Sequence, residues 1–230
     1  MGPEGVAIAV SLGGLGAALG VLAARGSVRA LRTRKLAQGM WGAGMALGAA
    51  AMAIELAAYL GVVDTPLLQA YVFLSAGIVG VLSLGAAGSL RRPRLARGFA
   101  AFEASALALT AAASFLTPLP RTMVTAGIIV GEPPTLLLVL SSIVTVPATV
   151  MLLGTAVTSL RHAFRWSHVT MLCGACVLGA GGALYIASFP VLLYYAEFVG
   201  IVLLFFGLVD FSRWAPASPA LAPKPVQTPN

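Results

Sequence analysis

The chain has 230 residues, of which 59% are hydrophobic and only 9% are charged. Because soluble domains carry about 25% charged residues, this composition excludes an ordinary soluble domain and is typical of a membrane-embedded protein. The net charge of +7 comes from short basic clusters between long apolar runs, with no interleaved aromatic residues. This distribution argues against nucleic-acid binding and is the kind that orients a protein in a membrane.

Seven apolar runs are long enough to cross a bilayer, which takes about 20 residues each. We predict spans at 5–24, 37–60, 67–90, 96–117, 134–158, 168–189 and 191–212. The expected fold is therefore all-α, a polytopic membrane bundle of seven transmembrane helices in a single domain, 1–214. Residues 215–230 are rich in proline, which removes backbone donors, so we predict a disordered Pro-rich cytoplasmic tail.

The basic residues predict the direction of the spans. They follow the first, third, fifth and seventh spans, and Arg121 is the exception. Since loops rich in Lys and Arg stay in the cytoplasm, the N-terminus is predicted outside and the C-terminus inside. The start, MGPEG, has no basic residue before the first apolar run, so we expect that span to be retained and not cleaved as a signal peptide. A multi-pass protein of a prokaryotic plasma membrane is the expected location.

Two predicted spans contain an acidic residue at a similar depth below the outer surface, Glu55 in the second and Glu197 in the seventh. An ionised carboxylate in hydrocarbon costs roughly 3 kcal/mol or more, so each must be compensated or must mark a functional site. Tyrosines at the same level supply phenolic donors. We predict an inward-facing site that binds a substrate, proton or cation, formed by Glu55, Glu197, Tyr59, Tyr71, Tyr194 and Tyr195. The alternative is that both acids reach interfacial water and the tyrosines form an aromatic belt.

Glu103 lies about two turns inside the fourth predicted span from its cytoplasmic end. We predict a structural inner salt bridge with Arg97, which precedes it by about two turns, and the alternative is a relay role. Between the fourth and fifth spans, TMVTAGIIVG is expected to form a hairpin on the outer surface, turning near Ala126 and Gly127. Pro147 interrupts the fifth span and should kink it, which suggests a gating role or, alternatively, a role in helix packing.

Cys173 and Cys176 form a C-x-x-C spacing within the sixth predicted span, with no neighbouring ligands. We therefore expect helix packing there, with neither metal binding nor redox chemistry. The sequence offers no Ser/His/Asp arrangement and no phosphate-binding loop. We expect a protein that is not an enzyme and has no cofactor and no metal site.

The two ends of the chain resemble each other. GMALGAAAMAIELAAYLGVVDTPLL in the second span aligns with GACVLGAGGALYIASFPVLL in the sixth, and the spans that follow them also align. We predict a parallel internal repeat of about 5–90 and 134–212, joined by a connector helix at 96–117. This layout is similar to that of the seven-helix sugar carriers and of opsin-like bundles, in architecture only. The Pro-Gln signature of the carriers is missing, and no predicted span contains a lysine for a retinal Schiff base.

Two functions fit these observations. The first is a small-solute carrier, or a proton/cation-coupled transporter, with a polar site in the outer half of the bundle. The alternative is a non-catalytic accessory or structural subunit of a larger membrane complex. The expected partners are the lipid bilayer, a small molecule or a proton or cation, and either another membrane protein or a second copy of the chain.

Overall fold

The computed structural model describes residues 3–33, 36–88, 90, 92–125, 128–129 and 133–162, with short pieces at 166, 169–170, 172–177, 199–200 and 203. The elements in chain order are α1 (Pro3–Thr33), α2 (Leu36–Tyr59), α3 (Thr65–Ala87), α4 (Pro93–Leu116), η1 (Arg121–Met123), β1 (Val124–Thr125), β2 (Ile128–Ile129) and α5 (Thr135–His162). Each of the five helices is long and apolar enough to cross a membrane. The chain is therefore an integral, multi-pass membrane protein.

The five helices correspond to the first five predicted spans, and most of their ends agree with the predictions to within a few residues. Most of the sixth and seventh predicted spans and all of the tail 215–230 lie outside the described residues. The second half of the proposed repeat lies partly outside them. Seven helices and an internal repeat therefore stay predictions.

Helix α1 is longer than the first predicted span, which ended at residue 24. It continues to Thr33, so Arg25, Arg29 and Arg32 lie on exposed positions of a helix and not in a loop. The sequence prediction marked the point where apolar composition ends. Arginine, alanine and leucine are good helix formers, so the backbone hydrogen bonding continues past that point.

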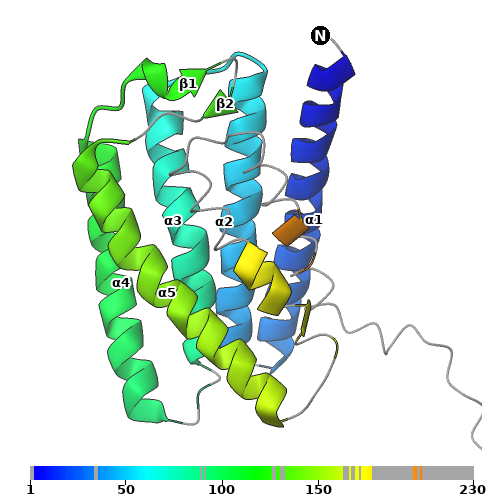
Figure 1. Ribbon diagram of the computed structural model, residues 1–230, viewed down its shortest axis with the longest axis vertical. Helices are drawn as coiled ribbons and strands as arrows, with labels where there is room; N and C mark the ends of the chain where they lie inside the picture. The colour runs from blue at the N-terminus through cyan, green and yellow to red at the C-terminus, as the bar shows by residue number, and fades with distance from the viewer. Residues whose placement is uncertain are drawn as a thin grey trace, which may run out of the picture.

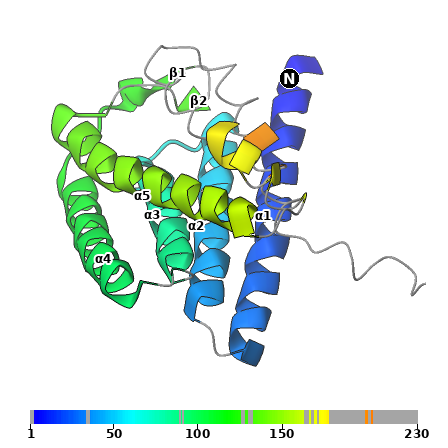
Figure 2. The same cartoon turned by 60° about the horizontal axis from the view of Figure 1, so that its bottom comes forward.

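Helices α1 to α4 stand side by side as a row, and α5 crosses this row diagonally (Figures 1 and 2). Each of the four helices packs against its neighbour in sequence, and α5 packs against both α3 and α4. Further along, Leu152 of α5 packs against a cluster of buried side chains from α1, α2 and α3 (Leu12, Leu15, Leu19, Leu22, Met45, Met52 and Leu82). Helix α5 thus runs across the row, from the side of α4 towards the side of α1 and α2.

Small residues set the closest helix contacts. A methyl group at Gly26 of α1 would lie 2.7 Å from the Cα of Gly42 of α2, so the two backbones nearly touch. A methyl group at Gly44 would lie 2.6 Å from a side-chain atom of Leu82 on α3. Because lipid tails are as apolar as leucine, membrane helices associate largely through such close packing, and glycine permits it.

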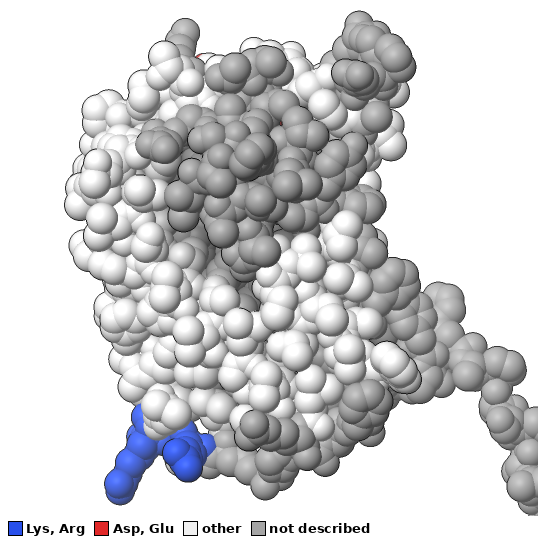
Figure 3. All heavy atoms as spheres, in the orientation of Figure 1, with Lys and Arg blue, Asp and Glu red and all other residues white. Residues whose placement is uncertain are grey.

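The two ends of the bundle, along the helix axes, differ in charge. Arg25, Arg29 and Arg32 lie near the end of α1, and Arg92, Arg94 and Arg97 lie near the start of α4. In Figure 3 the visible Lys and Arg atoms gather at this end, which we call the basic end. The opposite end carries the β1–β2 hairpin, and we call it the hairpin end. The positive-inside rule predicts that the basic end faces the cytoplasm.

The hairpin expected in the loop before α5 is confirmed. Strands β1 and β2 pair antiparallel, with Val124 opposite Ile129 and Thr125 opposite Ile128. The connection is anchored to α3 by Gln69, whose Nε2 donates hydrogen bonds to the carbonyl oxygens of Thr117 at 2.9 Å and Phe115 at 3.3 Å. The hairpin thus covers the same end of the bundle at which α2 ends and α3 begins (Figure 1).

Candidate carboxyl–tyrosine site

Glu55 lies on α2, four residues before the helix ends at Tyr59. The end of α2 is well defined because the amide of Gly61 donates to the carbonyl of Ala58 at 3.0 Å and that of Val62 to Ala57 at 2.9 Å. This is the Schellman pattern, and it requires the left-handed backbone that Gly61 adopts, with φ of 90°. The termination fixes how far Glu55 lies below the hairpin end, at about one helical turn.

The Glu55 side chain is 3% exposed, so it faces the interior of the bundle and not the lipid headgroups. Tyr71, six residues into α3, donates its phenolic hydrogen bond to Oε1 of Glu55. The second oxygen, Oε2, is buried and has no hydrogen-bond partner within the described part of the chain. The pair therefore joins two neighbouring helices and leaves one carboxyl oxygen available to a further donor or a cation.

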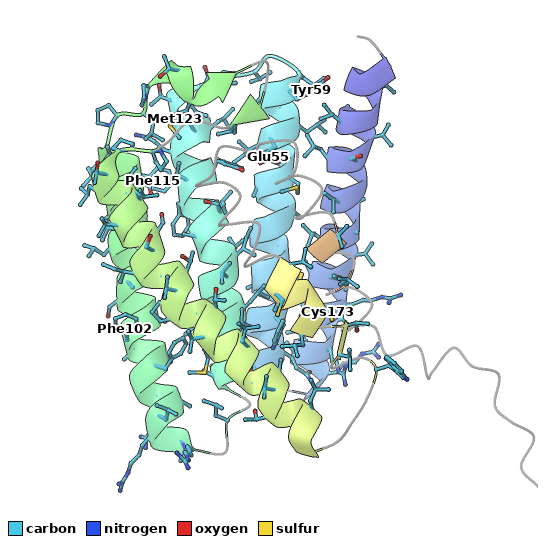
Figure 4. The ribbon with its side chains drawn as sticks, viewed as in Figure 1. Glu55, Tyr59, Phe102, Phe115, Met123 and Cys173 are labelled. Carbon is cyan, nitrogen blue, oxygen red and sulfur yellow. The ribbon has the colours of Figure 1, made fainter. Side chains whose placement is uncertain are left out.

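Apolar side chains close the site from the hairpin end. A buried cluster draws one or more residues from α2, α3, the α4–η1 connection, η1, β2 and α5: Ala58, Leu68, Val72, Leu119, Met123, Ile129 and Leu137. Tyr71 packs against this cluster with its ring, and β2 contacts α2. Figure 4 shows Glu55 and Met123 towards this end of the bundle. The carboxyl–tyrosine pair is therefore covered by the hairpin and the residues around it.

Tyr59 does not share this site, although it lies four residues from Glu55 on the same helix. Its ring packs against the cluster formed mainly by α1 and α2, on the side of α2 where Leu12, Leu15 and Leu19 lie. The predicted grouping of Glu55 with Tyr59 is therefore not formed, whereas that with Tyr71 is. Residues four positions apart lie on roughly the same face of a helix. Their side chains can still point in different directions when they pack against different neighbouring helices.

The remaining members of the predicted site cannot be placed. Glu197, Tyr194 and Tyr195 lie outside the described residues, so the convergence of two acids from the second and seventh spans stays a prediction. Among the described residues, the site consists of one acid and one tyrosine.

Glu103 of α4 is 0% exposed, and in the described structure neither of its carboxyl oxygens has a hydrogen-bond partner. The predicted salt bridge with Arg97 is not formed. Arg97 is exposed, and its Nε donates to the carbonyl of Pro93 at 3.4 Å. At 100° per residue, six positions place the two side chains about 120° apart around the helix, so they point to different sides. Glu103 points between α3 and α5, whereas Arg97 points outwards.

Two further buried polar residues on α4 were missed by the sequence analysis. Thr110 and Ser114 are both 0% exposed. Thr110 Oγ1 donates to the carbonyl of Ala106 at 2.9 Å, whereas the Ser114 hydroxyl has no partner among the residues described. They follow Glu103 by seven and eleven residues, which places all three on one face of the helix. This spacing of polar residues in an otherwise apolar span is the signal by which they could have been found.

Pro147 lies inside α5, which continues on both sides of it from Thr135 to His162. Its missing amide leaves the carbonyl of Ile143 without the usual helical partner. Pro147 follows the fully buried Val144, which contacts α3 and α4, by three residues. A gating role is compatible with this position and stays a prediction.

No protein-family model, curated protein or solved structure matches this chain. Function must therefore be argued from the site alone. Within the described residues there is no group of three or more His, Cys, Asp and Glu side chains that could hold a metal ion. What the site offers chemically is a buried carboxyl group that can exchange a proton or accept a cation, held in place by a phenol.

Proposed function

We propose that the protein is a small-solute carrier whose transport is coupled to a proton or cation, and that Glu55 and Tyr71 form part of its binding site. The observation that carries the proposal is the buried Glu55 carboxyl, which is bonded across helices through one oxygen and has no partner among the described residues at the other. A group this costly inside a membrane is a functional-site hypothesis by default. The proposed location is a prokaryotic plasma membrane, with the hairpin end outside.

The two carboxyl oxygens support different roles in this proposal. Oε1 is fixed by Tyr71 and sets the orientation of the group, whereas Oε2 has no hydrogen-bond partner among the residues that the structure describes. A proton on Oε2 makes the group a neutral hydrogen-bond donor to a polar solute. An ionised group instead accepts a cation or a cationic solute. In both cases the phenol keeps the carboxyl group from rotating when its ligand leaves.

Transport would require the hairpin end to open, because the site is covered there. The cover consists of a two-residue ladder and apolar contacts such as those of Met123 and Ile129. Opening the hairpin would expose these apolar side chains to interfacial water or lipid. It would not break a buried ion pair among the described residues. A hairpin movement coupled to a bend of α5 at Pro147 is the proposed route.

Reconstituted liposomes test the proposal. The full-length protein is placed in vesicles that contain a pH-sensitive dye, and proton uptake is measured under a membrane potential, with and without candidate solutes. We expect Glu55→Gln and Glu197→Gln to abolish uptake, and Tyr71→Phe to reduce it. Tyr59→Phe is the matched control and should leave uptake unchanged. Uptake by both glutamine variants at the wild-type rate would refute the carrier proposal.

A second candidate is supported by the closure of the described core. Glu55 and Glu103, the two acids inside the five candidate membrane spans, are 3% and 0% exposed, as in a sealed structural subunit. In this case the protein would be a non-catalytic accessory subunit of a membrane complex. Purification from its native membrane in a mild detergent separates the two candidates, because a subunit should migrate with stoichiometric partners and a carrier alone or as a homo-oligomer.

A further inference from the structure

Glu103 lies near the middle of the membrane-spanning part of α4. The helix extends ten residues before it and thirteen after it, which corresponds to about 15 Å and about 20 Å of helix axis. The hydrocarbon core of a bilayer is about 30 Å thick. The exposed Arg97 at the basic end is six positions, about 9 Å of helix axis, from Glu103, so the carboxyl group lies inside the hydrocarbon from both ends and deeper from the hairpin end.

The side chain lies where α3, α4 and α5 meet. A methyl group at Gly80 of α3 would be 2.8 Å from Glu103 Oε1, and it would also meet side-chain atoms of Leu107 and Val144 at 3.0 Å. Gly80 thus makes the space that the carboxyl group occupies. This space is lined by apolar side chains on the α4 and α5 sides.

No counter-charge faces Glu103 from the helices packed against it. The titratable residue on α3 is Tyr71, nine positions and about 13 Å along the helix from Gly80, and it is bonded to Glu55. On α5 they are Arg161 and His162, at least 17 positions and about 25 Å from Val144. On α4 itself, Arg94 and Arg97 are exposed at the basic end. Within the described structure, the carboxyl oxygens have no hydrogen-bond partner at all.

The buried face of α4 is polar on one side of Glu103 only. Towards the hairpin end it carries Thr110 and Ser114, both fully buried, and the Ser114 hydroxyl is unpartnered. Towards the basic end the same face carries Phe99 and Ala96. Water that enters the bundle along this face of α4 would therefore find hydroxyl groups on the hairpin side of Glu103. On α3 the buried Ser83, one turn from Gly80 towards the basic end, already donates its hydroxyl to the Gly80 carbonyl at 2.6 Å.

We propose that Glu103 is a second intramembrane proton-binding site, occupied in this arrangement and reached from the hairpin end along Thr110 and Ser114. An unpaired carboxylate in such surroundings would be far costlier than a neutral carboxyl group, so the bound proton is what allows the three helices to pack around it. The proposal is independent of any transport by the Glu55–Tyr71 site.

Release of the proton from Glu103 requires one water molecule as acceptor. The O–H bond of the Glu103 carboxyl group breaks, its electron pair stays on the carboxylate, and the proton passes to the oxygen of an entering water molecule. The hydroxyl groups of Thr110 and Ser114 hydrogen-bond to that water and are themselves unchanged at the end. The resulting charge draws water between α3, α4 and α5, so proton release and separation of these helices are linked.

Infrared spectroscopy of the full-length protein in liposomes tests the site directly. At neutral pH we expect a carbonyl band of protonated carboxylic acid, of which one component is lost in Glu103→Gln and is retained in the control Glu55→Gln. Raising the pH should abolish the band. In Thr110→Val/Ser114→Ala the band should remain, but its shift on transfer to heavy water should be slower than in the wild type.

If Glu103→Gln fails to fold, the same band is titrated in Glu55→Gln/Glu197→Gln, in which Glu103 is the acid that remains inside the first six predicted spans. A band at neutral pH that disappears as the pH rises supports the proposal there too. The proposal is overturned if Glu103→Gln leaves the spectrum unchanged, or if the double variant shows only ionised carboxylate at neutral pH. Equal exchange rates in the wild type and in the α4 variant would overturn the route of access.

Discussion

The phenol of Tyr71 on α3 hydrogen-bonds to the carboxyl group of Glu55 on α2, sixteen residues away in sequence. The contact lies about one turn below the hairpin end, where both helices are covered by apolar side chains. Because lipid supplies little hydrophobic driving force between helices, one polar contact of this kind also helps to set the register of α2 against α3.

A double-mutant cycle should detect this contact. Interhelical hydrogen bonds in membranes average about 0.6 kcal/mol and reach about 1.7 kcal/mol, so we expect Glu55→Gln and Tyr71→Phe to be coupled by an energy in this range. The measurement is reversible unfolding of the single and double variants in detergent. The cycle of Glu55→Gln with Tyr59→Phe is the control and should be additive, since Tyr59 packs on the other side of α2. Coupling that is equal in the two cycles would contradict the assigned geometry.

Replacing Gly80 by alanine tests the space around Glu103. The added methyl group would lie 2.8 Å from the carboxyl oxygen and 3.0 Å from Leu107 and Val144, so side chains from two helices must move. Overpacking of this kind costs about 1–3 kcal/mol. The melting temperature should fall accordingly, whereas Gly98→Ala, at an open position of α4, should leave it unchanged or raise it. A Gly80→Ala protein as stable as the wild type would show that α3, α4 and α5 do not meet as described.

The closest approach of α1 and α2 is predicted to tolerate no side chain. At Gly26 and Gly42 the atoms met first are backbone atoms, at 2.7 Å and 2.9 Å, and these cannot rotate away. Overpacking costs about 1–3 kcal/mol, and we expect Gly26→Ala and Gly42→Ala each to destabilise the protein by the upper end of this range or more. Gly20→Ala is the matched control on α1, because nothing lies within 4 Å of its added methyl group. Thermal unfolding in detergent compares the three, and similar losses at all three sites would contradict the packing.

Cysteine labelling tests the orientation. In a background with Cys173→Ser and Cys176→Ser, a cysteine at Thr122, which is exposed in η1, should react with a membrane-impermeant thiol reagent added to intact cells. A cysteine at Arg92, exposed at the basic end, should react only after the membrane is permeabilised. The expectation follows from the positive-inside rule. The reverse pattern would place the N-terminus in the cytoplasm.

The sequence predicts the five described helices well because a bilayer demands about 20 apolar residues and little else. It fails at the end of α1, since hydropathy marks the limit of the hydrocarbon and not the limit of the helix. The hairpin before α5 was also predicted, because a glycine-containing turn lies between two short β-branched runs.

The candidate site was predictable in part. The presence of a glutamate in an apolar span indicated an inward-facing group, and Glu55 is buried. Its partner could not be read from spacing, since Tyr71 reaches it from another helix while Tyr59 turns towards α1. For Glu103, an Arg97 two turns away suggested an ion pair, but six residues do not complete two turns and the side chains diverge. Contacts between helices depend on rotation and crossing angle, which composition does not fix.

The diagonal course of α5 has a consequence for how the protein enters its membrane. Helices α2, α3 and α4 each contact the preceding helix, so the first four helices can be inserted one after another as they leave the ribosome. Only when α5 follows, and Leu152 packs against the cluster formed by α1, α2 and α3, does a late segment join the first helices to the fourth. A nascent chain halted before residue 134 should therefore be a loose array and an easy substrate for a membrane protease, and synthesis of α5 should confer resistance.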